Sequence, residues 1–124
     1  MADQMENKEF EIGLIGGIEK REIVLEEYNS EWPTMFEAQR AIIHNALGNA
    51  ALNVEHIGST SVPGLSAKPI IDVLVVVLNS ANEATYLPQL LSAGYVLRVR
   101  EPDWNEHRMF RTISKDVHVH VYSA

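Results

Sequence analysis

The segment from Pro69 to Leu78 constrains the fold more than any other stretch of this sequence, because every residue in it except Asp72 is aliphatic or a proline. The run is shorter than the roughly 18 residues that a membrane-spanning helix needs. Its β-branched and aliphatic side chains are typical of a central strand that is buried on both faces. We therefore expect a domain built around a β-sheet, with helices packed against it.

The rest of the chain supplies the partners of that strand. Alternating or short apolar runs predict further strands at residues 51–57, 95–100, 107–114 and 116–122, with a short edge strand at 21–28. Helical spacing predicts helices at 33–47 and 79–92. Residues 1–20 are acidic and without a sustained period, which is typical of a flexible extension. The prediction is one α/β (α+β) domain over residues 21–124, with a mixed sheet flanked by helices.

Composition limits the partners that such a domain can have. Asp and Glu outnumber Lys and Arg by 17 to 10, a formal net charge of -7, and an acidic surface repels duplex nucleic acid and anionic membranes alike. The chain has no cysteine, which excludes disulfides, a thiolate nucleophile and Cys-ligated metals. The N-terminus also lacks the basic start of a signal peptide. We expect a soluble cytoplasmic protein whose metal ligands are histidines and carboxylates.

The turn Gly58-Ser59-Thr60-Ser61 follows the strand expected at 51–57. A glycine lets a phosphate approach the backbone N–H groups closely, and three hydroxyls add further donors. The same residues also make ordinary turns and helix caps, because Ser and Thr bond well to the local backbone. Both interpretations, a phosphate-binding turn and a structural turn, stay open on this pattern.

Asp72 is the one ionisable residue of the aliphatic strand. Burying a carboxylate costs several kcal/mol unless it is paired or binds a cation, so this residue requires a partner. One interpretation pairs it with Lys68, His56 or backbone N–H groups. The other makes it a ligand of a divalent cation beside the Gly58–Ser61 turn.

His118 and His120 are two residues apart on the last expected strand, so both side chains lie on one face while the neighbouring valines lie on the other. If this strand lies beside that of Asp72, then His56, Asp72, His118 and His120 converge on a metal site. A His-x-His pair on a solvated strand face is the alternative.

Basic residues concentrate near the C-terminus, at Arg98, Arg100, His107, Arg108 and Arg111. An anion subsite and simple pairing with neighbouring carboxylates are both compatible with this pattern. Alternation along the strand places His107 and Arg111 on the face opposite Arg108.

Three segments together resemble a known family. The long run from Glu55 to Val73, the stretch from Tyr28 to Pro33, and the final His118–Tyr122 are closely similar to the GrpB family of bacterial proteins, which belongs to the nucleotidyltransferase-like superfamily. The resemblance implies a mixed sheet flanked by helices, with Gly58 and Ser59 in the phosphate-binding turn and Asp72 as a metal carboxylate.

The sequence departs from that superfamily at two places. Leu74 occupies the position of a second carboxylate, and a later strand offers His118 and His120 where Asp or Glu is usual. Because Mg²⁺ prefers oxygen ligands, this set suits Zn²⁺ or Mn²⁺ better.

The hypothesis is a protein that binds a nucleotide or other phosphorylated small molecule through the Gly58–Ser61 turn. The expected metal, Mg²⁺, Mn²⁺ or Zn²⁺, is held by His56, Asp72, His118 and His120. Lys68 is a phosphate contact, Arg111 stabilises charge, and with Asp72 they form the catalytic set of a metal-dependent nucleotidyltransferase or phosphohydrolase. The alternative is a non-catalytic ligand-binding or interaction module on the same fold.

The end of the chain carries one more expectation. Family members continue with helices past the His-x-His strand, whereas this sequence stops at Ala124. We therefore expect a sheet face that is less covered, and a chain that self-associates or is less stable than a longer member.

Overall fold

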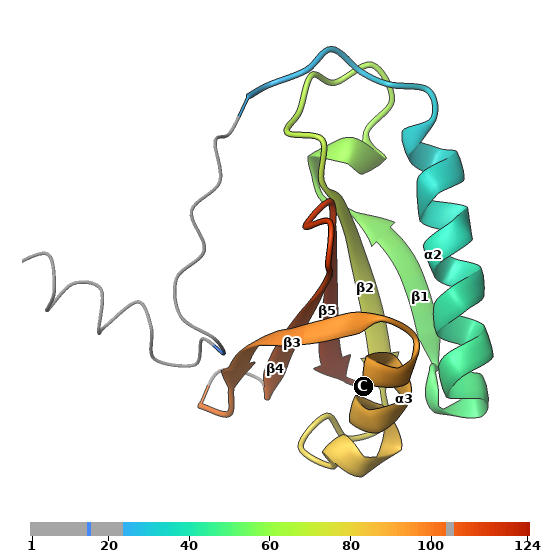
Figure 1. The fold of residues 1–124 in the computed structure, drawn as a ribbon, viewed down its shortest axis with the longest axis vertical. Coiled ribbons are helices and arrows are strands. Elements are labelled where there is room, and N and C mark those ends of the chain that lie inside the picture. Colours follow the sequence, from blue (N-terminus) through green and yellow to red (C-terminus); the bar gives the residue numbers. More distant parts are fainter. Residues whose placement is uncertain (1–14, 16–23, 104–105) are drawn as a thin grey trace, which may run out of the picture.

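The computed structural model describes residues 15, 24–103 and 106–124, and its centre is a five-stranded sheet with two α-helices against one face (Figure 1). The strands are β1 (Asn53–Ile57), β2 (Ile71–Val77), β3 (Tyr95–Glu101), β4 (His107–Thr112) and β5 (Val117–Ser123). The α-helices are α2 (Trp32–Leu47) and α3 (Leu87–Ser92), and single 3₁₀ turns cover η1 (Gly48–Ala50), η2 (Ser59–Ser61) and η3 (Glu83–Thr85).

The sheet is mixed, as the sequence predicts. Its strand order is β1-β2-β5-β4-β3; β2 and β5 run parallel, and the other neighbours are antiparallel. The register pairs Asp72 with His118 and Leu74 with His120. The strand that carries Asp72 therefore lies directly beside the strand that carries both histidines.

The helix α2 forms where the pattern predicts it. Pro33 fits the first turn, where its missing N–H has no intrahelical partner, and Gly48 ends the helix at a φ of 54°. The buried face of α2 consists of Trp32, Phe36, Ile43 and Leu47, which pack over β1 and β2. In the described part of the chain, no helix combines the length and apolar character needed to cross a membrane.

The second helical segment is shorter than expected. Instead of a helix over 79–92, the structure has the 3₁₀ turn η3 and the short α3, with Pro88 in the first turn of α3. Proline lacks the N–H that would continue a helix through this point, so the two pieces form separately. The Tyr95 hydroxyl donates to Gln39 Oε1 at 2.5 Å, which ties β3 to α2, and burial raises the pKa of Tyr95 to about 12.

The strand β2 corrects one expectation. Ile71, Val73, Val75 and Val77 are at most 1% exposed, whereas Asp72 and the other alternate residues are partly exposed. The strand is internal in the sheet, between β1 and β5, but it is fully buried on one face only, because α2 and α3 both lie against the same face.

The expected edge strand at 21–28 is also corrected. Its described part, from Val24 onward, forms a single antiparallel bridge in which Glu26 and Ala67 exchange two backbone hydrogen bonds of 2.9 Å. Exposed side chains flank this bridge. A longer pairing would bury little apolar surface and would therefore gain little stability. Residues 21–23 lie outside the described residues, and so does the expected flexible extension apart from Ile15. Ile15 is hydrogen-bonded to Arg98.

Most of the C-terminal basic residues serve the fold rather than an anion subsite. The Glu83 carboxylate accepts from Arg100 Nε at 2.7 Å and from Arg108 Nε at 2.6 Å, and Arg108 also bonds to Glu106 at 3.2 Å. Arg108 is only 4% exposed, so this network compensates a buried charge. The bond from Arg100 holds the pKa of Glu83 below its usual value.

Candidate metal and phosphate site

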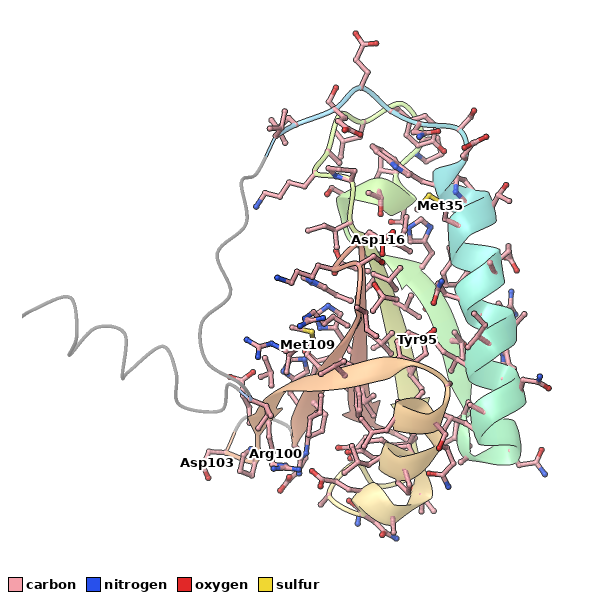
Figure 2. All side chains as sticks on the ribbon, in the orientation of Figure 1. Met35, Tyr95, Arg100, Asp103, Met109 and Asp116 are labelled. Atoms are coloured by element: carbon pink, nitrogen blue, oxygen red, sulfur yellow. The ribbon has the colours of Figure 1, made fainter. Side chains whose placement is uncertain are left out.

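Polar side chains collect on the sheet face that lies away from the helices, which we call the open face. It carries the alternate residues of the strands that point away from α2 and α3. Figure 2 shows Met109 on this side of the sheet and Tyr95 on the helix side. The residues of the open face that matter below are Asp72 on β2, Glu101 on β3, His107 and Arg111 on β4, and His118 and His120 on β5.

Three of these residues form a compact donor set. One ligand atom from each of Asp72, His118 and His120 lies within 4.8 Å of the others. Asp72 Oδ1 is 3.1 Å from His120 Nε2 and 3.8 Å from His118 Nδ1. A tetrahedral ion with bonds of about 2.1 Å places its ligand atoms about 3.4 Å apart, between these two distances. Both distances from Asp72 Oδ1 are therefore close to the spacing in a tetrahedral metal site.

The donor set is accessible from solvent. The side chains of Asp72, His118 and His120 are 27%, 29% and 24% exposed. An ion held by three protein ligands keeps open coordination positions, which is the arrangement of catalytic rather than structural zinc sites. The parallel register of β2 and β5 is what brings the carboxylate and the imidazoles to one place.

A pocket of about 430 Å³ adjoins this donor set and joins it to the Gly58–Ser61 turn. Asp72 and His118 line it together with Ser59 and Lys68. The remaining lining residues are Leu25, Ser66, Ala67 and Ile70. The pocket thus combines a carboxylate, an imidazole, serine hydroxyls and the amine of Lys68. Lys68 is exposed to solvent.

Gly58 is required where this turn approaches β2. Its φ of 75° and ψ of -173° belong to a region of backbone space that glycine alone occupies readily. A Cβ at this position would lie 2.8 Å from Asp72 Oδ2. This close approach confirms the prediction that the carboxylate lies within reach of the turn.

The other two hydroxyls of the turn are occupied by the fold. Thr60 is 1% exposed, and its hydroxyl donates to the Ile70 carbonyl at 2.9 Å. Ser61 donates to the Gly58 carbonyl at 2.5 Å. Of the four turn residues predicted to bind a ligand, Ser59 lines the pocket and Gly58 shapes the turn, while Thr60 and Ser61 hold the turn together.

His56 does not join the donor set, which corrects the expected four-residue metal site. In the antiparallel register His56 faces Val73, so it lies on the helix side of the sheet. Its ring stacks on Phe36 with centroids 4.9 Å apart, and its Nε2 lies 3.0 Å from the Thr60 hydroxyl. Because that hydroxyl donates to Ile70, it accepts a hydrogen from His56. Burial lowers the pKa of His56, which favours this neutral form.

Arg111 lies on the open face, in register with His118 across β4 and β5. Its guanidinium donates to the Thr112 carbonyl at 2.9 Å. The predicted charge-stabilising residue is therefore on the correct face, although it does not line the pocket.

Two residues lie beside the donor set where the sequence does not predict them: the sequence places His107 only among the C-terminal basic residues and gives Glu101 no part in the site. His107 Nε2 lies 3.2 Å from His120 Nδ1, and His107 Nδ1 lies 2.8 Å from Glu101 Oε1. Burial lowers the pKa of His107, and the neighbouring Glu101 opposes that shift. Alternation had put His107 on the face of Arg111, but only the pairing of β4 with β5 brings it against His120.

The fold and the site define an α+β domain with a mixed sheet and a histidine-carboxylate cluster on its open face. The sequence profile described as "GrpB protein" matches residues 22–124, and the chain belongs to this family. It is 56% identical over 101 residues to a UPF0157 protein of Halalkalibacterium halodurans, covering 82% of this chain and 52% of that protein. It is 53% identical over 111 residues to a UPF0157 protein of Streptomyces coelicolor, covering 90% and 58%.

A solved structure has the same fold. The crystal structure of the conserved protein GrpB from Enterococcus faecalis superposes with a TM-score of 0.72 at 36% identity, covering 81% of this chain and 61% of that chain. The chain spans a little over half the length of the two curated relatives. The family resemblance predicted from the sequence is confirmed.

Proposed function

We propose that this GrpB-family protein binds a nucleotide or another phosphorylated small molecule in the pocket beside Ser59, next to a divalent metal ion held by Asp72, His118 and His120. One observation carries the proposal. Asp72 and His118 belong to the three-residue donor set and also line the pocket that contains Ser59 and Lys68. A metal and a phosphate group would therefore share one cavity, where their opposite charges favour each other.

The chemistry of the donor set selects the metal. Two imidazoles and one carboxylate suit Zn²⁺ or Mn²⁺, whereas Mg²⁺ prefers a shell of oxygen ligands. Leu74 occupies the position of a second carboxylate on the open face of β2. The site is therefore proposed to hold one transition-metal ion rather than the pair of magnesium ions that two-metal transfer uses.

Each remaining residue has a proposed role toward the phosphate. The Ser59 hydroxyl donates to a phosphate oxygen, and the Lys68 amine, which belongs to the same pocket, neutralises the phosphate charge. Arg111 adds positive charge on the neighbouring strand. These are the contacts that an anionic ligand needs, in a protein whose overall charge of -7 otherwise repels it.

The proposed reaction is metal-dependent hydrolysis or transfer at the phosphoryl group. A bound metal ion supplies Lewis-acid polarisation of a phosphoryl oxygen. Lys68 stabilises the negative charge that develops there, Arg111 adds positive charge from β4, and Asp72 orients the site from the internal strand β2. The nucleotidyltransferase-like superfamily, with its Gly-Ser turn and following carboxylate, is the proposed evolutionary setting of this chemistry.

A non-catalytic ligand-binding or interaction module is the second candidate, and a separate observation favours it. Asp72 already contacts His120 at 3.1 Å, and the Thr60 and Ser61 hydroxyls are bonded within the fold. Contacts of this kind can hold the cluster together without a metal ion. Under this candidate the pocket binds its ligand without turnover, and metal has no effect on binding.

Metal binding separates the two candidates. The protein is purified without chelator, its metal content is measured, and metal-free protein is titrated with Zn²⁺ by calorimetry. We expect one Zn²⁺ per chain for the wild type and loss of binding in Asp72→Ala. Glu55→Ala is the matched control, because it removes a carboxylate from β1 on the same open face. Zn²⁺ affinity that is equal in both variants would contradict the site.

Ligand binding is tested next, by the thermal unfolding midpoint with a panel of nucleotides and inorganic phosphate. A ligand at 100 times its Kd adds about 2.7 kcal/mol of stability, which raises the midpoint by several degrees. We expect Lys68→Ala to abolish the rise and Arg40→Ala, an exposed residue of α2, to retain it. A rise that depends on Zn²⁺ favours the metal-dependent enzyme, and one that does not favours the binding module.

A further inference from the structure

We infer that His107 and Glu101 are positioning residues of this metal site: through hydrogen bonds they hold the His120 ring so that its Nε2 faces Asp72 without a hydrogen. The inference rests on the proposed metal site and extends it from β2 and β5 to β4 and β3. It concerns two residues that do not touch the metal position themselves.

The four side chains form a continuous row of contacts across four adjacent strands. Asp72 Oδ1 lies 3.1 Å from His120 Nε2, and His120 Nδ1 lies 3.2 Å from His107 Nε2. His107 Nδ1 in turn lies 2.8 Å from Glu101 Oε1. The row follows the strand order β2-β5-β4-β3, so the sheet itself sets the spacing of its members.

The row has one hydrogen fewer than its contacts. Three contacts link two carboxylates and two imidazoles, and an ionised carboxylate only accepts. Each neutral imidazole has one N–H, so two rings supply hydrogens for only two of the three contacts. Of the two carboxylates, Glu101 has the shorter contact: its Oε1 lies 2.8 Å from His107 Nδ1, against 3.1 Å from Asp72 Oδ1 to His120 Nε2, and we therefore assign the hydrogen of His107 to Glu101.

The hydrogen on His107 Nδ1 determines which nitrogen of His120 carries a hydrogen. With its hydrogen on Nδ1, His107 presents a bare Nε2, which accepts the hydrogen of His120 Nδ1. His120 is then left with a bare Nε2 that faces the Asp72 carboxylate. Two acceptors that face each other at this distance are complementary to a cation between them. A metal ligand histidine whose other nitrogen donates to a fixed acceptor is the usual arrangement at metal sites.

The packing holds this arrangement in place. His107 is only 6% exposed, and its ring lies against that of Tyr122 with centroids 4.7 Å apart. The His107 and His120 rings are nearly parallel, at 15°, with the bonded nitrogens on their facing edges. Neither ring can turn away without losing its contact with the other, so the row is preorganised.

The test measures Zn²⁺ affinity of the full chain by calorimetry, together with the ring nitrogens of His120 by ¹⁵N NMR. His107→Phe keeps a ring against Tyr122 but cannot accept from His120. Glu101→Gln alters the end of the row at a side chain that is 39% exposed, so it leaves the packing intact. Glu55→Gln, which also removes an open-face carboxylate, and Tyr122→Phe are the matched controls.

We expect His107→Phe to weaken Zn²⁺ binding by about 10- to 100-fold, the range for loss of such outer contacts, and Glu101→Gln to weaken it less. Both controls keep wild-type affinity. The Zn²⁺-bound wild type shows a protonated Nδ1 and a metal-bound Nε2 on His120, and this signature broadens or shifts in His107→Phe. His107→Gln, whose amide oxygen accepts a hydrogen, restores part of the affinity.

The outcomes distinguish this inference from the proposed function. If Asp72→Ala abolishes Zn²⁺ binding while His107→Phe and Glu101→Gln bind as the wild type does, the metal site stands and the positioning role is overturned. If the wild type binds no Zn²⁺, the metal site is wrong and the positioning role falls with it. If His107→Phe does not fold, the affinity and NMR signature of Glu101→Gln decide the question.

Discussion

The two faces of the sheet differ in burial and in chemical character. On the helix side, Val73, Val119 and Phe110 are completely buried. On the open face, their chain neighbours Asp72, His118 and His120 are about a quarter exposed and contact one another. Because side chains alternate along a strand, residues one position apart lie either in the buried core or in the polar cluster of the open face. The comparison predicts that substitutions on the helix side alter folding, whereas those on the open face alter binding.

The largest effect is expected in the core of the helix side. Phe110 is 0% exposed and contacts the Tyr86 ring edge-on at 6.1 Å. Phe110→Ala should lower the free energy of unfolding by about 3–5 kcal/mol, because it leaves a cavity. Met109→Ala, one residue earlier on the open face, should cost about 1 kcal/mol. Urea unfolding measures both; equal losses would contradict the division between the faces.

The ion network on the helix side is expected to come next. Glu83→Ala leaves Arg108, at 4% exposure, without its main carboxylate and should cost about 3 kcal/mol at pH 7. Glu37→Ala, which breaks an exposed pair with Arg40 on α2, should stay within about 0.5 kcal/mol.

The same network has a pH signature with a defined sign. The pKa of Glu83 is lowered in the folded state, so its contribution is fully present above the unfolded value of 4.5 and is lost as pH falls below it. Unfolding measured from pH 7 to pH 3 should therefore show a smaller loss for Glu83→Gln than for the wild type. Parallel curves would mean that the carboxylate has no lowered pKa.

A substitution at Gly58 tests the contact between the turn and Asp72 on the open face. Gly58→Ala combines backbone strain at a φ of 75° with a Cβ 2.8 Å from Asp72 Oδ2, and should cost about 2 kcal/mol and weaken Zn²⁺ binding. Gly64→Ala has a similar φ of 81° but nothing within 4 Å of the added Cβ. It should cost about 1 kcal/mol and leave Zn²⁺ affinity unchanged. Equal Zn²⁺ affinities in the two variants would separate the turn from the site.

The smallest expected effect concerns His56. Burial lowers its pKa in the folded state, so its contribution is present above the unfolded value of 6.5 and is lost as pH falls through the lowered value. Between pH 7 and pH 5 the wild type should lose more stability than His56→Gln, whose amide can also donate to Thr60. A wild-type curve that is no steeper than the variant's would contradict a buried neutral imidazole.

Self-association of the chain through its open face remains a prediction. Apolar side chains such as Leu74 and Met109 lie on it beside the polar cluster, and they are only partly buried. Sedimentation at several concentrations tests whether a second copy covers them. A monomer at every concentration, with a constant unfolding midpoint, would contradict the prediction.

Local pattern was sufficient wherever a property belongs to a single element. The aliphatic run of β2, the helix α2 with Pro33 and Gly48, and the single face shared by His118 and His120 are all set by short-range periodicity. The close approach of the turn to Asp72 was also predictable from the chain order, because residues 59–70 alone connect Gly58 to the start of β2.

Only the tertiary structure decided which strands present their polar residues to the same side. Within one strand, alternation relates the faces, but between strands the relation depends on register, and a shift of one residue reverses it. The antiparallel register of β1 sets His56 opposite Val73 on the helix side, whereas the pairing of β4 with β5 brings His107 to His120. The sequence alone therefore determined the candidate residues, and the strand register chose among them.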